Sequence, residues 1–160
     1  MKKLISMVCV LCVSMIALTS CDDSDDYGVK LPTYTDVVMT CNGQVVNPAS
    51  VPVGQGINLT LTHGRKAQNI YLFTYTWTCE PAVEGLNPQV RSNNCNDVPN
   101  GMTITSPGTY TLTIKVKYDF SGNDTPDVPD TSDKSLIDVA YDQPGYLWSY
   151  ATIRKQFTAR

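Results

Sequence analysis

The sequence has few of the residues that build catalytic and metal centres. Its 160 residues include one histidine, His63, and its only glutamates are Glu80 and Glu84. It contains neither a Gly-x-Ser-x-Gly element nor a phosphate-binding glycine loop. We therefore predict a protein that is not an enzyme and has no catalytic residues. A pair of carboxylates meeting in a cleft would overturn this, because glycosidases work with two carboxyl groups.

Basic residues are also scarce. The chain has 12 Lys and Arg against 15 Asp and Glu, which gives a formal net charge of −3. Binding to nucleic acid depends on clustered cations that neutralise phosphates. The composition therefore predicts no nucleic-acid partner.

Long hydrophobic runs are absent except near the first residue. Lys2 and Lys3 precede an apolar stretch, residues 4–18, which is shorter than the ~20 residues that a membrane-spanning helix needs. A basic start, an apolar stretch of this length and small residues before a cut describe a secretory signal peptide. We predict that residues 1–20 are removed. The net charge would then fall to −5, because the removed segment holds two lysines and no acid.

The residues around the expected cut resemble a lipid-attachment site. Leu18-Thr19-Ser20-Cys21 resembles the lipobox of bacterial lipoproteins, and the acidic residues 22–26 resemble the export tag of Bacteroidetes-type surface lipoproteins. The resemblance implies acylation of Cys21 and a place on the cell-surface side of the outer membrane, where two or more acyl chains anchor a protein stably. We expect residues 21–33 to be a lipidated cysteine and an acidic tether. The alternatives are an ordinary signal peptide and a plain extended tether.

Three cysteines remain once the signal peptide and Cys21 are set aside. They are Cys41, Cys79 and Cys95, in a compartment that permits disulfides. We favour a Cys79–Cys95 disulfide, which would stabilise the fold by ~3 kcal/mol in the chain-entropy model; Cys41–Cys79 is the alternative. A zinc site is not expected, because these cysteines form no C-x-x-C pair and His63 stands alone.

After Pro32 the apolar residues alternate with a period of two, which is typical of strands and not of helices. The predicted strands are residues 35–41, 44–46, 57–62, 69–79, 102–105, 109–118 and 145–159. The first two are joined by Asn42-Gly43, which suits a tight hairpin. About seven short strands predict an all-β fold, an immunoglobulin-like antiparallel β-sandwich. We place this single domain at residues 34–160, with an acidic insertion at residues 119–144.

Two motifs resemble the PKD-like (polycystic-kidney-disease) immunoglobulin-like domain. They are Tyr75-Thr76-Trp77 and, downstream, the run from Ser106-Pro107-Gly108 through Tyr110 and Leu112. The resemblance implies that the two strands are neighbours around a shared apolar interior. The sequence departs from the family after Trp77, where Thr78-Cys79-Glu80-Pro81 stands in place of a Gly-Asp-Gly turn.

Alternation assigns four residues to the predicted core: Trp77, Tyr75, Tyr110 and Leu112. Trp77 is expected to fill the space between the sheets. Tyr110, just after a turn, is expected to place its hydroxyl on a backbone group, as a tyrosine corner does.

The acidic insertion is the least ordinary segment. It holds seven aspartates: Asp119, Asp124, Asp127, Asp130, Asp133, Asp138 and Asp142. Oxygen ligands at this density suit Ca²⁺, for which Asp119 and Asp124 are the candidates. The segment lacks the closing glutamate of an EF-hand, so we predict no metal and no cofactor, with calcium as the alternative.

The last predicted strand carries the clearest binding signal. Leu147, Ala151, Ile153 and Phe157 share one face, and Tyr146, Trp148 and Tyr150 share the other. If the aliphatic face is the core side, three rings line the outside of the sheet, and such rows often mark recognition surfaces. Tyr141 and Asp142 would extend this surface, and nearby Asp and Lys could bond sugar hydroxyls. The alternative is that the row faces inward.

The sequence therefore predicts a lipid-anchored surface module that binds a partner without catalysis. A glycan is the ligand that the aromatic row favours, and the membrane is contacted through the lipid. The alternative is a structural spacer or assembly subunit that touches other envelope proteins.

Overall fold

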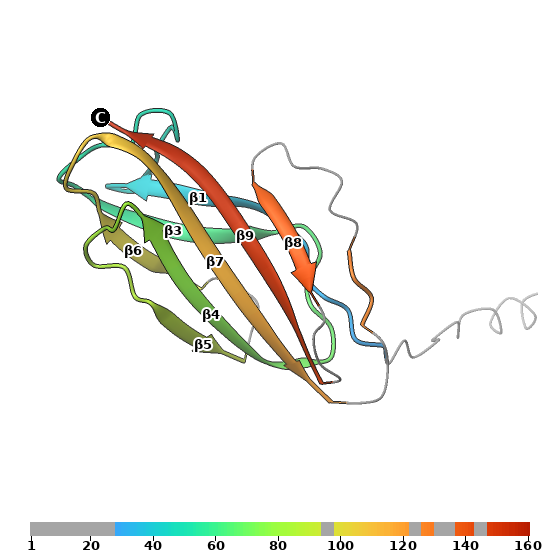
Figure 1. Cartoon of the computed structure of the whole chain (residues 1–160). Coiled ribbons are helices and arrows are strands. Elements are labelled where there is room, and N and C mark those ends of the chain that lie inside the picture. The colour runs from blue at the N-terminus through green and yellow to red at the C-terminus, as the bar shows by residue number, and fades with distance from the viewer. Residues whose placement is uncertain (1–27, 94–97, 122–125, 130–136, 143–146) are drawn as a thin grey trace, which may run out of the picture.

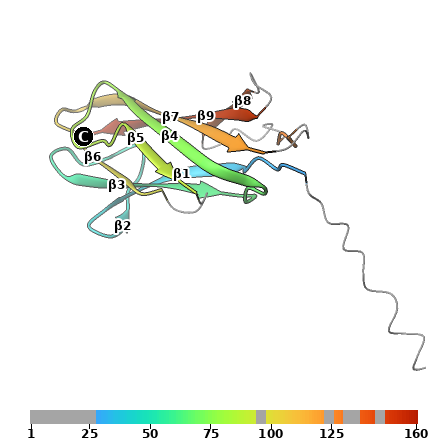
Figure 2. The ribbon, with the colours of Figure 1, turned by 90° about the horizontal axis from the view of Figure 1, so that it is seen from below.

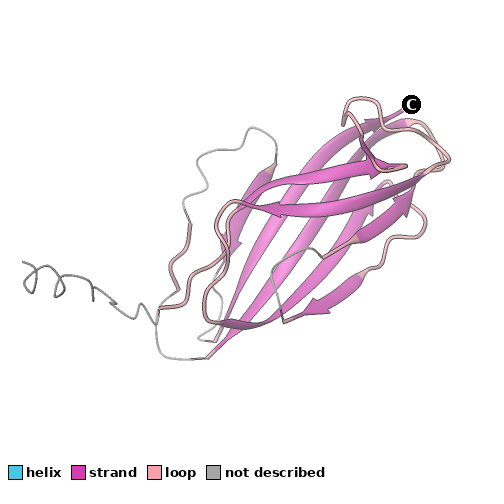
Figure 3. Cartoon of the chain, turned by 180° about the vertical axis from the view of Figure 1, so that it is seen from behind, coloured by secondary structure: helices cyan, strands magenta, loops and turns pink. Residues whose placement is uncertain are grey.

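The computed structural model describes residues 28–93, 98–121, 126–129, 137–142 and 147–160. This part of the chain consists of strands and loops (Figure 3). Its nine strands form two antiparallel sheets that pack face to face in a sandwich-like arrangement (Figure 1 and Figure 2). The all-β prediction is therefore confirmed. The described residues include no helix that could span a membrane.

One sheet has four strands in the order β2-β1-β3-β6. These strands are β1 (Tyr34–Cys41), β2 (Gln44–Val45), β3 (Gly56–His63) and β6 (Asn100–Thr103). The predicted hairpin joins β1 to β2, and both turn residues have positive φ, 49° at Asn42 and 78° at Gly43. This backbone conformation is the reason for an Asn-Gly pair at this point.

The other sheet has five strands in the order β5-β4-β7-β9-β8. They are β4 (Ile70–Glu80), β5 (Gln89–Ser92), β7 (Gly108–Phe120), β8 (Asp138–Asp142) and β9 (Trp148–Ala159). The two strands that carry the family-like motifs, β4 and β7, are hydrogen-bonded neighbours, with Trp77 opposite Ile114. The long strands β4, β7 and β9 form the centre of this sheet (Figure 1).

The sequence does not predict β5 and β8, which lie in segments that it favours as loops. Each is an edge strand of four or five residues, with too few apolar residues to show alternation. They form because a long neighbour offers them free backbone hydrogen-bonding groups: β5 pairs with β4, and β8 pairs with β9.

The inward faces of the two sheets share one apolar core. The four predicted core residues lie in it: Trp77, Tyr75, Tyr110 and Leu112 are each at most 3% exposed. The Tyr110 hydroxyl donates a hydrogen bond to the carbonyl oxygen of Ser106 at 2.7 Å. This is the backbone contact expected of a tyrosine just after a turn.

Two polar contacts join the sheets across the sandwich. The hydroxyls of Tyr34 in β1 and Tyr118 in β7 are 2.6 Å apart, and burial, followed by the neighbouring Tyr118, raises the pKa of Tyr34. The Lys155 ammonium in β9 pairs with the Asp36 carboxylate in β1, and the Lys155 side chain is 4% exposed. Buried charges need such partners.

The segment before β1 is part of the folded domain, whereas the sequence predicts a tether through residue 33. Val29 and Leu31 are buried in the core. The Arg65 guanidinium holds the segment by donating to the carbonyl oxygen of Leu31 and pairing with Asp127 at 2.6 Å. The tether therefore ends before Val29.

Candidate functional site

The candidate site is the outer face of the five-stranded sheet. In an antiparallel pair, residues directly opposite each other point to the same side. Residues that are paired across neighbouring strands therefore form rows on this face. One such row runs Arg91, Thr74, Lys117, Tyr150 and Asp142, from β5 to β8.

Two rings of the predicted aromatic row lie on this outer face. Trp148 is 38% exposed, and Tyr150 is half-buried. The alternate residues Ser149, Ala151 and Ile153 are fully buried. The third ring, Tyr146, lies outside the described residues.

The prediction for Leu147 is wrong. The sequence places it on the core face with Ala151, but its side chain is 45% exposed. The residue precedes β9, and its carbonyl oxygen accepts the Phe120 amide at the end of β7. Alternation does not extend to it because the regular strand begins only at Trp148.

Lysines from β7 stand beside the rings of β9. The Lys115 Nζ is 4.2 Å from the centroid of the Tyr150 ring, and the Lys117 Nζ is 5.7 Å from that of Trp148. Both contacts are of the cation–π type. The Lys117 Nζ also lies 2.5 Å from the Asp119 Oδ1, and this hydrogen bond raises the pKa of Lys117. The outer face therefore places lysine side chains beside aromatic rings, and Asp119 balances the charge of Lys117.

The prediction for Tyr141 is also wrong. Tyr141 lies opposite Ala151 and so points to the core side of β8. Its hydroxyl donates to the carbonyl oxygen of Pro32 at 2.6 Å, and burial raises its pKa. It supports the segment before β1 instead of extending the recognition surface. Asp142 lies opposite Tyr150, so it does share the outer face.

Tyr71 is an aromatic residue of this region that sequence alternation misplaces. The pattern puts it on the core face with Phe73, but the register shifts between Ile70 and Leu72, and Tyr71 is 59% exposed. A bulge of this kind turns the following or preceding side chain to the other face. Periodicity gives no sign of where a bulge falls.

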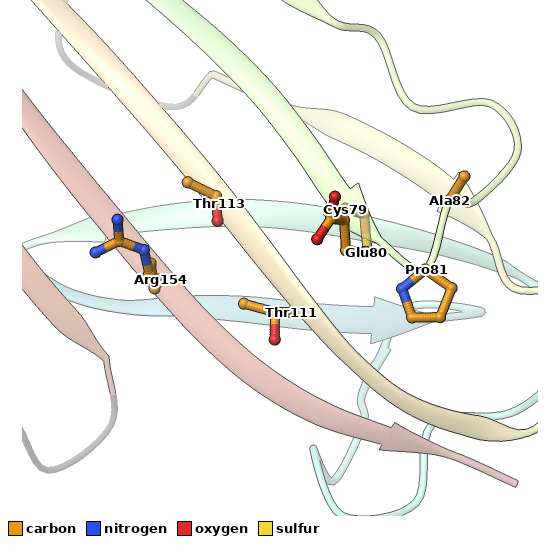
Figure 4. A pocket seen from close by; sticks show the side chains of 7 residues that line it. All are labelled: Cys79, Glu80, Pro81, Ala82, Thr111, Thr113 and Arg154. Atoms are coloured by element: carbon orange, nitrogen blue, oxygen red, sulfur yellow. The ribbon is translucent and has the colours of Figure 1, made fainter.

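The end of the face farthest from Trp148 has a different chemistry. A shallow depression there is lined by Cys79, Glu80, Pro81, Ala82, Thr111, Thr113 and Arg154 (Figure 4). Glu80 is the one carboxylate in this lining. The depression therefore lacks the paired carboxylates of a glycosidase.

Cys79 and Cys41 carry free thiols. The structure accordingly contains neither the predicted Cys79–Cys95 disulfide nor the alternative Cys41–Cys79, and Cys95 itself lies outside the described residues. Burial, followed by the neighbouring Glu80 charge, raises the pKa of the Cys79 thiol to about 11. The thiol is therefore protonated at neutral pH.

Alkylation of Cys79 by iodoacetamide should be slow at pH 7 and accelerate until the pH passes about 11, because the thiolate is the reacting species. Peptide-level mass spectrometry measures this rate separately from those of Cys41 and Cys95. Glu80→Gln removes the nearby negative charge and should increase the rate at pH 8. A rate that levels off near pH 8.5 would contradict the raised pKa.

The calcium candidates do not form a site in the described residues. Asp119 pairs with Lys117, and Asp124 lies outside the part that the structure describes. No group of three or more His, Cys, Asp or Glu side chains there could hold a metal ion.

No family model, curated protein or solved structure matches this chain. The functional argument therefore depends on the geometry of the outer face. Lys115 and Lys117 complete that geometry. The alternation of residues 109–118 already places both on the polar side of their strand, but only the register between β7 and β9 brings them to the rings.

Proposed function

We propose that this protein is a lipid-anchored surface module, with an immunoglobulin-like, PKD-like sandwich, that binds a glycan through the outer face of its five-stranded sheet. The observation that carries the proposal is the half-buried Tyr150 ring on that face, with the Lys115 Nζ 4.2 Å from the ring centroid. The module acts by recognition and has no catalytic step.

The chemistry of this face suits a sugar with acidic groups. Ring faces are apolar and pack against the C–H faces of sugars. Exposure of an aromatic surface to water is unfavourable in free energy, and a bound partner removes that exposure. Lys115 offers a donor and a positive charge for a carboxylate or sulfate group. Asp142, in the same row as Tyr150, offers an acceptor for hydroxyls.

The anchor is the second part of the proposal. The Leu-Thr-Ser-Cys sequence ending at Cys21 supports cleavage and acylation there. Intact mass of the protein purified from membranes should match residues 21–160 plus acyl chains. A mature protein that begins at Met1, or that carries no lipid, would contradict the proposed anchor.

Glycan binding is tested on a soluble form that begins at residue 21 and carries Cys21→Ser. A glycan array identifies a ligand, and calorimetry measures its Kd. Tyr150→Ala should weaken binding at least tenfold, or about 1.4 kcal/mol, and should cost less thermal stability than truncation of a core residue, because Tyr150 lies half-buried on the outer face. Thr60→Ala, on β3 of the other sheet, should leave Kd unchanged. Equal binding by Tyr150→Ala and the unaltered protein would refute this site.

A structural spacer is the second candidate. The observation that favours it is the threonine-rich half of the same face, where Thr76, Thr78, Thr111 and Thr113 lie on neighbouring strands without an aromatic ring among them. A polar surface of this kind suits a spacer, which needs no ligand-binding rings. Absence of any array ligand, with retention of envelope proteins by the anchored chain after crosslinking, would favour the spacer.

A further inference from the structure

The exposed apolar side chains of this protein gather at the end of the sandwich where the described chain begins. Among the described residues, five large hydrophobic side chains are exposed: Val45, Tyr71, Val128, Leu147 and Trp148. Only Val45 lies at the other end, in the β1–β2 hairpin. Figure 1 shows the described chain beginning beside the end of β7 and the start of β9, with the C-terminus at the opposite end.

Hydrogen bonds connect the segments that meet at this end of the sandwich. The Asn69 side chain donates to the carbonyl oxygen of Gly28 at 3.0 Å, which places Gly28 beside the start of β4. Ile70 pairs with Phe120, whose amide bonds to Leu147.

Val128 belongs to the same end of the molecule. It follows Asp127, whose amide donates to the carbonyl oxygen of Val29 at 2.8 Å. The exposed residues Tyr71, Val128, Leu147 and Trp148 therefore all belong to the end of the sandwich where the described chain begins. We refer to them as the tether-end patch.

The tether is short compared with the domain. Six residues separate Cys21 from Gly28, and the seven Cα–Cα steps between them span at most about 25 Å. The strand β9 alone, with 12 residues, is about 40 Å long. An anchored Cys21 thus keeps the tether-end patch within about 25 Å of the bilayer, a distance shorter than β9 itself.

We infer that the tether-end patch rests on the lipid bilayer that holds the anchor, with Trp148, Tyr71 and Leu147 in its interfacial layer. The inference depends on the proposed anchor at Cys21 and not on the proposed glycan. Trp and Tyr prefer this layer because their rings are apolar and their edges are polar. The anchor makes a patch of this small size sufficient, because it raises the local concentration of the bilayer.

Contact through apolar side chains fits a neutral bilayer better than a strongly anionic one. The tether carries Asp22, Asp23, Asp25 and Asp26, which anionic headgroups would repel. At the patch, Lys117 is already paired with Asp119. The domain is thereby held in one orientation, with β9 leading away from the membrane.

Trp148 fluorescence tests the inference, because the chain has only two tryptophans and Trp77 is buried. The acylated mature protein is placed in phosphatidylcholine vesicles that carry bromine on the acyl chains near the headgroup. We expect blue-shifted Trp148 emission and at least twofold stronger quenching than in the soluble Cys21→Ser form. Trp148→Phe supplies the Trp77 background.

A pair of variants separates patch contact from anchoring. Tyr71→Asp combined with Leu147→Asp should abolish the quenching of Trp148 while the protein stays on the vesicles through its lipid. Val45→Asp, at an equally exposed position at the far end, should leave the quenching unchanged. Anchored protein whose Trp148 is not quenched would overturn the inference and leave the proposed glycan site standing. A mature protein without lipid would overturn both the anchor and the inference.

Discussion

Trp77→Ala should lower the free energy of unfolding by ~3–5 kcal/mol, which is typical of truncating a large core side chain. Trp77 is 1% exposed and lies at the centre of β4, opposite Ile114 of β7. Its indole lies between the two sheets. Alanine therefore leaves a cavity there, which closes only if the two sheets move together. Urea unfolding of the soluble form, followed by circular dichroism, measures the loss.

The control for this variant is Trp77→Phe, which keeps an aromatic ring in the core. Among the described residues, no acceptor bonds to the Trp77 Nε1, so phenylalanine removes volume but no hydrogen bond. Its loss of stability should be clearly smaller than that of alanine. A loss below 1 kcal/mol for Trp77→Ala would contradict the position of this side chain in the core.

The core could be predicted from the sequence because it depends on local alternation. The run from Tyr110 to Tyr118 places every second residue inward, and the structure buries these residues. The Asn42-Gly43 hairpin could also be predicted from the sequence, since its turn conformation depends on two adjacent residues. Features of this kind need no knowledge of which strands are neighbours.

Features that depend on distant pairing could not be predicted. The strands β5 and β8 exist only because β4 and β9 are available to pair with them. Tyr71 is exposed because of a register shift, and Tyr141 is drawn inward by the carbonyl oxygen of Pro32. Each case involves a contact between segments that are far apart in the sequence, so the period-two pattern does not predict it.

The candidate site shows the same division. Alternation places Trp148 and Tyr150 on one side of a strand, but only the strand order places Lys115 over the Tyr150 ring. The pairing of Asp36 with Lys155 is a stronger example. It joins the first and last strands of the domain, and a lysine within the apolar alternation of β9 gives no indication of its partner.

Asp36→Ala should destabilise the domain by about 3 kcal/mol, because it leaves a buried ammonium without its counter-charge. The Lys155 side chain is 4% exposed, whereas that of Asp36 is 24% exposed. Water can therefore solvate the carboxylate in part but not the ammonium. The Asp36 carboxylate also accepts the Val37 amide, and alanine removes that contact as well.

The two partners should consequently respond unequally to substitution. Lys155→Met fills the same space with an unbranched apolar chain and leaves Asp36 bonded to Val37 and in contact with water, so its loss should be less than half that of Asp36→Ala. Combining Asp36→Ala with Lys155→Met should recover most of the stability, since no buried charge remains. Urea unfolding of the three variants gives the coupling free energy directly. Strictly additive losses would mean that solvent, and not Asp36, stabilises the Lys155 ammonium, and that the two sheets are held together at this point by apolar packing alone.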